Sequence, residues 1–93
     1  MKITPKNLPR HELIGLKVKI VKSPNSSELG IEGVIIYETM NTLHVETKRG
    51  RKIIIKKDRL FQIWLPDGLK VTVEGNVILG RPEDRLKKKL KSW

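Results

Sequence analysis

The two histidines are the first residues of this chain whose chemistry could be catalytic. His11 is followed by Glu12, as in zinc proteases, but the motif of those enzymes needs a second histidine four residues after the first, where this chain has Gly15. The other histidine, His44, lies in a segment that alternates like a strand. Two isolated histidines are poor material for a Ser-His-acid triad. We therefore predict no catalytic residue in this chain.

The glycines offer no convincing phosphate loop. The run Gly30-Ile31-Glu32-Gly33 matches the GxxG pattern of KH domains, yet that loop joins two helices and usually carries basic residues, whereas this run opens a predicted strand. No glycine is followed by the Gly-Lys-Ser/Thr of a nucleotide-hydrolysing loop. The absence of cysteine removes disulfides, thiolate nucleophiles and nearly every structural zinc arrangement. We expect neither a metal ion nor a cofactor.

Positive charge is the strongest chemical signal. Twenty Lys and Arg residues against ten Asp and Glu residues give a formal charge of +10, and the pI is about 10.2. Such a surface attracts polyanions, nucleic acid first among them. The run Lys48-Arg49-Gly50-Arg51-Lys52 places four cations around one predicted hairpin tip. Arginine binds phosphate in a bidentate manner and stacks on bases, so the arginines are the better candidates.

Aromatic side chains give no support to a base-stacking platform. The chain has four of them, and Phe61 and Trp64 lie in a predicted strand where core packing is expected. We therefore expect recognition of shape and phosphate backbone, with an affinity that falls steeply as salt rises.

The elements that must position these cations are mostly strands. Apolar residues alternate with polar ones from Leu16 to Lys22, a pattern typical of a strand with one buried and one basic face. Short strands at this spacing, without room for parallel crossovers, favour a small closed or nearly closed barrel of five or six antiparallel strands. The predicted strands are 16–22, 34–38, 43–47, 52–56, 60–65 and 70–74, the last bulging or dividing before 77–80.

The two ends of the chain differ from this β-rich middle. Residues 1–9 are predicted to be an arm, and residues 10–15 a short helical turn that opens a barrel domain at 10–80. Residues 81–93 are predicted to form a basic helix, whose apolar stripe is expected to pack on the barrel or on a partner. The longest apolar runs, of three to four residues, are too short to span a membrane, and the N-terminus lacks a secretory signal, so we expect a cytoplasmic protein.

Three separated motifs carry a resemblance to a known family. They are HELIGLKV at 11–18, GIEGVI at 30–35 and GRPEDRLKK at 80–88. In this order and spacing the chain resembles archaeal ribonuclease P protein component 1 over about residues 8–92. The resemblance implies an Sm-like β-barrel with flanking helices, and a subunit of the enzyme that removes 5′ leaders from precursor transfer RNA. It also implies that the RNA subunit performs the chemistry and that a second, zinc-ribbon protein subunit, which holds the metal, binds this chain.

The sequence thus predicts an RNA-binding subunit that stabilises the catalytic RNA of ribonuclease P and contacts precursor transfer RNA indirectly. A ribosomal protein is the main alternative, because Gly30–Ile35 inside a small basic barrel is also similar to the KOW motif. The third candidate function is a chromatin-type binder of duplex DNA, and the last is a ribonuclease that acts on its own. The candidate RNA-binding residues are Arg10, Lys17, Lys48, Arg49, Arg51, Lys52, Lys56, Arg81 and Arg85, and the candidate residues for the protein partner are Leu8, Leu13, Ile35, Leu86, Leu90 and Trp93.

Overall fold

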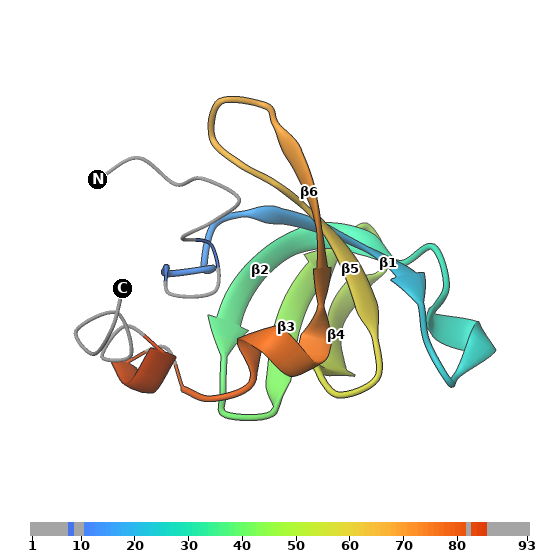
Figure 1. Cartoon of the computed structure of the whole chain (residues 1–93). Coiled ribbons are helices and arrows are strands. Elements are labelled where there is room, and N and C mark those ends of the chain that lie inside the picture. The colour runs from blue at the N-terminus through green and yellow to red at the C-terminus, as the bar shows by residue number, and fades with distance from the viewer. Residues whose placement is uncertain (1–7, 9–10, 82, 86–93) are drawn as a thin grey trace.

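The computed structural model describes residues 8, 11–81 and 83–85 (Figure 1). Most of the predicted arm and most of the predicted C-terminal helix lie outside the described residues. The same holds for four candidate site residues, which are Arg10, Leu86, Leu90 and Trp93.

Six antiparallel strands form one sheet, so the prediction of a mainly β fold is confirmed. The strand order is β4-β3-β2-β1-β5-β6, in which β2, β3 and β4 form a meander and β5 and β6 form a hairpin. The strands are β1 (Lys17–Lys22), β2 (Glu32–Glu38), β3 (Thr42–Thr47), β4 (Gly50–Ile55), β5 (Leu60–Trp64) and β6 (Lys70–Glu74), and two 3-10 turns are η2 (Ser26–Glu28) and η3 (Gly75–Ile78).

Alternation decides which side chains of β1 enter the core. Val18 and Ile20 are buried, whereas Lys17 and Lys22 are exposed at the two ends of the strand. In β2 the alternation is interrupted, because the register against β3 shifts between Ile35 and Tyr37. The extra residue is a β-bulge, and it turns both Ile35 and Glu38 toward the interior. The bulge therefore places a carboxylate inside the protein.

Close backbone contact brings together the segments that follow the two edge strands of the sheet. Gly75 follows β6 and Lys56 follows β4, and a Cβ on Gly75 would lie 1.6 Å from the Lys56 carbonyl oxygen. The Gly75 amide donates to the Arg59 carbonyl at 2.8 Å. Only glycine fits this approach, so the sheet closes into a barrel-like shape through backbone packing at Gly75.

Three residues predicted to bind a protein partner belong instead to the core. Leu8, Leu13 and Ile35 are each 0% exposed and pack in the main hydrophobic cluster. The prediction that their side chains form a partner surface is therefore wrong, because the chain itself uses their apolar surface.

The segments outside the sheet also correct the sequence analysis. Residues 11–15 form no helix, because the Gly15 amide donates across to the Ile35 carbonyl at 2.7 Å. Val77 and Ile78 lie in η3 and not in the predicted strand segment at 77–80. A helix is present at residues 83–85, within the predicted C-terminal helix. Among the described residues we find no helix that could span a membrane.

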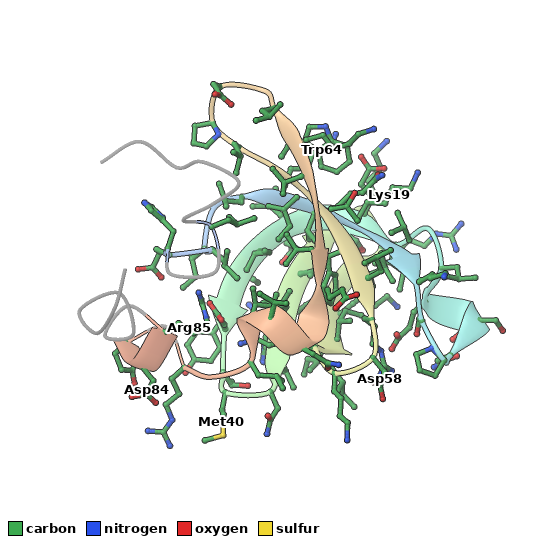
Figure 2. The ribbon with its side chains drawn as sticks, viewed as in Figure 1. Lys19, Met40, Asp58, Trp64, Asp84 and Arg85 are labelled. Atoms are coloured by element: carbon green, nitrogen blue, oxygen red, sulfur yellow. The ribbon has the colours of Figure 1, made fainter. Side chains whose placement is uncertain are left out.

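Glu38 is buried between two cations. Arg85 donates from Nε to Glu38 Oε2 at 3.0 Å and from Nη2 to Oε1 at 2.6 Å, and Lys56 donates from Nζ to Oε2 at 2.7 Å. All three side chains are at most 1% exposed. Figure 2 shows Arg85 on the C-terminal segment, from which it reaches the body of the sheet. Charges removed from water this completely persist only when they are paired and hydrogen-bonded.

Backbone carbonyls complete the coordination of both cations. Lys56 Nζ also donates to the carbonyls of Thr39 at 2.8 Å and Gly80 at 2.9 Å, and Arg85 Nη1 donates to the His11 carbonyl at 3.0 Å. Burial lowers the pKa of the Lys56 ammonium below its ordinary value of 10.5, while the hydrogen bond and charge of Glu38 oppose that shift. The predicted RNA contacts of Lys56 and Arg85 are therefore wrong, because neither side chain reaches solvent.

Replacing Glu38 should strongly destabilise the fold. The change Glu38→Gln leaves two buried cations without their carboxylate, and we expect a loss of about 3–5 kcal/mol in the free energy of unfolding. Urea denaturation at neutral pH measures this loss. The exposed Glu46→Gln is the matched control and should change the value by less than about 0.5 kcal/mol. Equal midpoints for the two variants would show that the buried carboxylate is dispensable.

Candidate nucleic-acid interface

The basic hairpin tip between β3 and β4 has a fixed backbone. Thr47 pairs with Gly50, and the Thr47 hydroxyl accepts from the Arg49 amide at 3.1 Å and donates to the Gly50 carbonyl at 2.7 Å. Gly50 has a φ of 105°, which glycine adopts without strain. The predicted tight turn is confirmed. Its four cations, Lys48, Arg49, Arg51 and Lys52, are all exposed on this rigid support.

A groove of about 880 Å³ lies beside this hairpin. Its walls come from the hairpin tip, from the start of β1 and from the loop that carries η2, seen in cyan in Figure 1. Four of the predicted RNA-binding residues meet here: Lys17 comes from β1, and Lys48, Arg49 and Lys52 come from the β3–β4 hairpin. The lining residues are Lys17, Ser27, Leu29, Gly30, Ile31, Glu32, Gly33, Glu46, Thr47, Lys48, Arg49 and Lys52.

Gly33 lets two strands approach closely in the groove wall. A Cβ at this position would lie 2.1 Å from the Glu46 carbonyl oxygen and 2.9 Å from Val45 Cγ1. Any larger residue would push β2 away from β3. Gly30 serves a different purpose, since its φ of 84° turns the chain into β2. The two glycines of the GxxG run thus shape the groove through the backbone.

The electrostatics of the groove are dominated by its cations. Lys17 Nζ lies 2.9 Å from Glu32 Oε2, and this hydrogen bond and charge lower the pKa of the Glu32 carboxyl below its ordinary value, with smaller contributions from Lys19 and Lys48. Among the described residues, no ion pair involves the hairpin cations. Their charge is therefore available to a polyanion, and one carboxylate beside them stays ionised.

The loop bordering the groove is held by a second ion pair. Arg59 Nε donates to Glu28 Oε1 at 3.0 Å, and the Ser23 hydroxyl donates to the same oxygen at 2.7 Å. Burial alone would raise the pKa of Glu28, but the hydrogen bonds from Arg59 and Ser23, together with the charge of Arg59, outweigh it and lower the pKa. Arg59 thus anchors η2 to the segment that precedes β5.

The remaining candidate RNA-binding residues are dispersed. Arg51 is exposed on the hairpin, opposite Glu46 in the register, but it is not one of the residues that line the groove. Arg81 is exposed beyond η3 and does not line the groove. Lys56 and Arg85 are internal, as described above. The structure thus brings together four of the nine predicted residues.

Sequence analysis missed an exposed row that adjoins the groove. Trp64 pairs with Lys17 on one side and with Lys70 on the other, so the three side chains share the outer face of the sheet. The expectation of core packing is confirmed for Phe61, which is 0% exposed, and is wrong for Trp64, which is only partly buried. The sequence did contain a signal for this orientation. Side chains alternate along a strand, so if Phe61 and Ile63 point inward, Trp64 must point outward.

Comparison with known proteins gives the family. The family model described as ribonuclease P/MRP, subunit p29, matches residues 6–88. The chain belongs to this family. The match confirms the resemblance seen in the three sequence motifs, and it favours the ribonuclease P prediction over the ribosomal alternative.

Individual relatives agree with this family assignment. The chain is 51% identical over 89 residues to ribonuclease P protein component 1 of Methanocaldococcus jannaschii, covering 96% of this chain and 94% of the relative. It is 48% identical over 94 residues to the protein of the same name from Thermofilum pendens, covering 100% of both chains. Among solved structures, Mth11, titled a homologue of human RNase P protein Rpp29, has a TM-score of 0.60 and 39% identity over 82% of this chain and 99% of its own.

The ion pair of Glu28 predicts a pH-dependent stability. Its folded pKa lies below the ordinary value of 4.5, so its contribution is present above pH 4.5 and is lost as the pH falls through the folded pKa. We expect Glu28→Gln to cost about 1 kcal/mol of unfolding free energy at pH 7, and the difference from the parent to shrink below pH 4.5. Thermal unfolding across pH measures it. Arg59→Met should give the same profile, and a pH-independent difference would contradict this explanation.

Proposed function

We propose that this p29-family chain is the RNA-binding subunit of ribonuclease P and that its basic groove binds phosphates of the catalytic RNA. One observation carries the proposal: Lys48, Arg49 and Lys52 stand exposed on a rigid hairpin beside the groove, with no ion pair to another described residue. Lys17 adds a fourth cation from β1. Because the hairpin backbone is already ordered, phosphate binding there does not have to order the loop.

The proposed role is to support the RNA rather than to cleave it. Folded RNA brings phosphates close together, and cations at a crowded point reduce their repulsion and release condensed counterions. The groove cations would act there in the way that magnesium ions do, so the subunit stabilises the RNA fold that removes 5′ leaders from precursor transfer RNA. Contact with the precursor itself is then indirect, through the catalytic RNA.

We infer that the zinc-ribbon protein implied by the resemblance binds the outer face of β2, β3 and β4. Tyr37, Ile53 and Ile55 are 55%, 60% and 49% exposed. Tyr37 packs edge-on against His44 at a centroid distance of 5.2 Å, and His44 pairs with Ile53 in the register. A patch of large apolar side chains on an edge strand suits a protein partner. The assembly is expected to work in the cytoplasm.

The groove predicts a specific salt dependence. Replacing two of its cations, Arg49→Gln and Lys52→Gln, should weaken binding to the chain's own ribonuclease P RNA. The slope of log affinity against log salt should fall by about 1.4–1.8, at roughly 0.7–0.9 per lost phosphate contact. Filter binding over a salt series measures the slope.

A charge-matched control separates the groove from net charge. Lys22 and Lys57 are exposed but do not line the groove, so the double change to Gln removes the same charge elsewhere. We expect this control to change the slope by much less than the groove variant. Equal slopes for both variants would contradict a specific RNA site in the groove.

The proposed protein interface has its own test. Ile53→Lys places a charge in the centre of the apolar patch and should abolish co-purification of the zinc-ribbon subunit, because a buried unpaired ammonium is costly. The salt slope for RNA should not decrease, since Ile53 is outside the groove. Unchanged co-purification would remove this face from the interface.

A further inference from the structure

A tryptophan stands between two lysines on the outer face of the sheet. In the register Lys17 pairs with Trp64, and Trp64 pairs with Lys70, so one row crosses β1, β5 and β6. Lys17 Nζ lies 5.1 Å and Lys70 Nζ 5.9 Å from the ring centroid of Trp64. These distances are typical of cation–π contacts. The row is therefore an aromatic surface with a cation on each side.

The core does not require a tryptophan at this position. Its neighbours in the chain, Ile63 and Leu65, are 0% and 3% exposed and supply the core contacts of this part of the structure. Trp64 faces the other way and stays partly exposed. Figure 2 shows it near the base of the projecting β5–β6 hairpin, on the same side as Lys19. A large aromatic ring held at the surface is a feature of sites that bind flat ligands.

The row is continuous with the groove through Lys17. This side chain lines the groove and also lies over the Trp64 ring. The next row of the same face carries Lys19, Gln62 and Thr72, which are all polar or basic. A strand of RNA whose phosphates occupy the groove can therefore continue over β1 and β5 without crossing an apolar patch.

We propose that Trp64 stacks on an unpaired base of the bound RNA, while Lys17 and Lys70 contact the phosphates on either side of that nucleotide. This inference rests on the proposed RNA-binding function and adds to it a subsite for single-stranded RNA. The chemistry is general, because every base offers a π-face to an aromatic ring and the preference for sequence is small.

A purely structural role for the row makes a different prediction. If the lysines only shield the Trp64 ring from water, their contacts stabilise the fold and nothing depends on a base. If the ring stacks on a base, binding depends on the base itself as well as on the phosphates. An RNA strand without bases separates these two cases, since it keeps the charge and loses the π-face.

The experiment measures binding of the full chain to two short RNA strands of equal length, an oligoadenylate and the matching abasic strand. Trp64→Ala should weaken oligoadenylate binding by about 5- to 100-fold and leave abasic binding nearly unchanged. Trp64→Phe, which keeps an aromatic face, should restore most of the affinity, whereas Trp64→Leu should not. Thermal unfolding of each variant confirms that it is folded at the temperature of the assay.

The groove variant makes the two proposals separable. Arg49→Gln with Lys52→Gln should weaken binding of both strands equally, because it removes phosphate contacts only. If the groove variant weakens binding and the Trp64 variants do not, stacking is overturned and the proposed function stands. If folded Trp64→Leu binds oligoadenylate as tightly as Trp64→Phe, the aromatic face is irrelevant. If the parent binds neither these strands nor its own ribonuclease P RNA, both proposals fail.

Discussion

The rest of the structure depends on the buried ion pairs that Glu38 makes with Lys56 and Arg85. A single carboxylate accepts hydrogen bonds from Lys56 and Arg85, which are distant in sequence. Arg85 also donates a hydrogen bond to the carbonyl of His11, and Lys56 donates one to the carbonyl of Gly80. The segments before β1, after β2, after β4 and after η3 are thereby tied to one point. Because each partner would be costly to leave unpaired in the interior, the network specifies one arrangement of these segments.

The network and the groove lie at opposite ends of the same strand. Glu38 ends β2, whereas Glu32 and Gly33, which line the groove, begin it. Six residues of extended chain separate them by about 20 Å. One end of the barrel is thus closed by paired charges, whereas at the other end the hairpin cations Lys48, Arg49 and Lys52 have no ion pair to another described residue. Lysine and arginine thus stabilise the fold where they are buried, and they are available to a ligand where they are exposed.

The proposed RNA surface combines two kinds of contact. The hairpin cations offer charge at a fixed place, which favours any crowded phosphate backbone. The row through Trp64 offers a flat apolar face beside two ammonium groups, which favours an unpaired nucleotide. Lys17 belongs to both regions. A subunit that neutralises phosphates and holds one exposed base would stabilise a local RNA fold without a reactive group of its own.

The sequence by itself determined the local features of this protein. Alternation placed Val18 and Ile20 in the core, and turn chemistry placed the cations of 48–52 at a hairpin tip. Three motifs indicated the resemblance to archaeal ribonuclease P protein component 1, which the family comparison confirms. Each depends on residues near one another in the chain, so a local pattern suffices to predict it.

Only the tertiary structure decided the roles of Lys56, Arg85 and Trp64. Lys56 and Arg85 look like surface cations until the bulge in β2 turns Glu38 inward to meet them. The row of Lys17, Trp64 and Lys70 exists only because β1 and β6 pair with β5. Whether a cation is buried or exposed depends on partners far along the chain, and no local pattern encodes which strands will be neighbours.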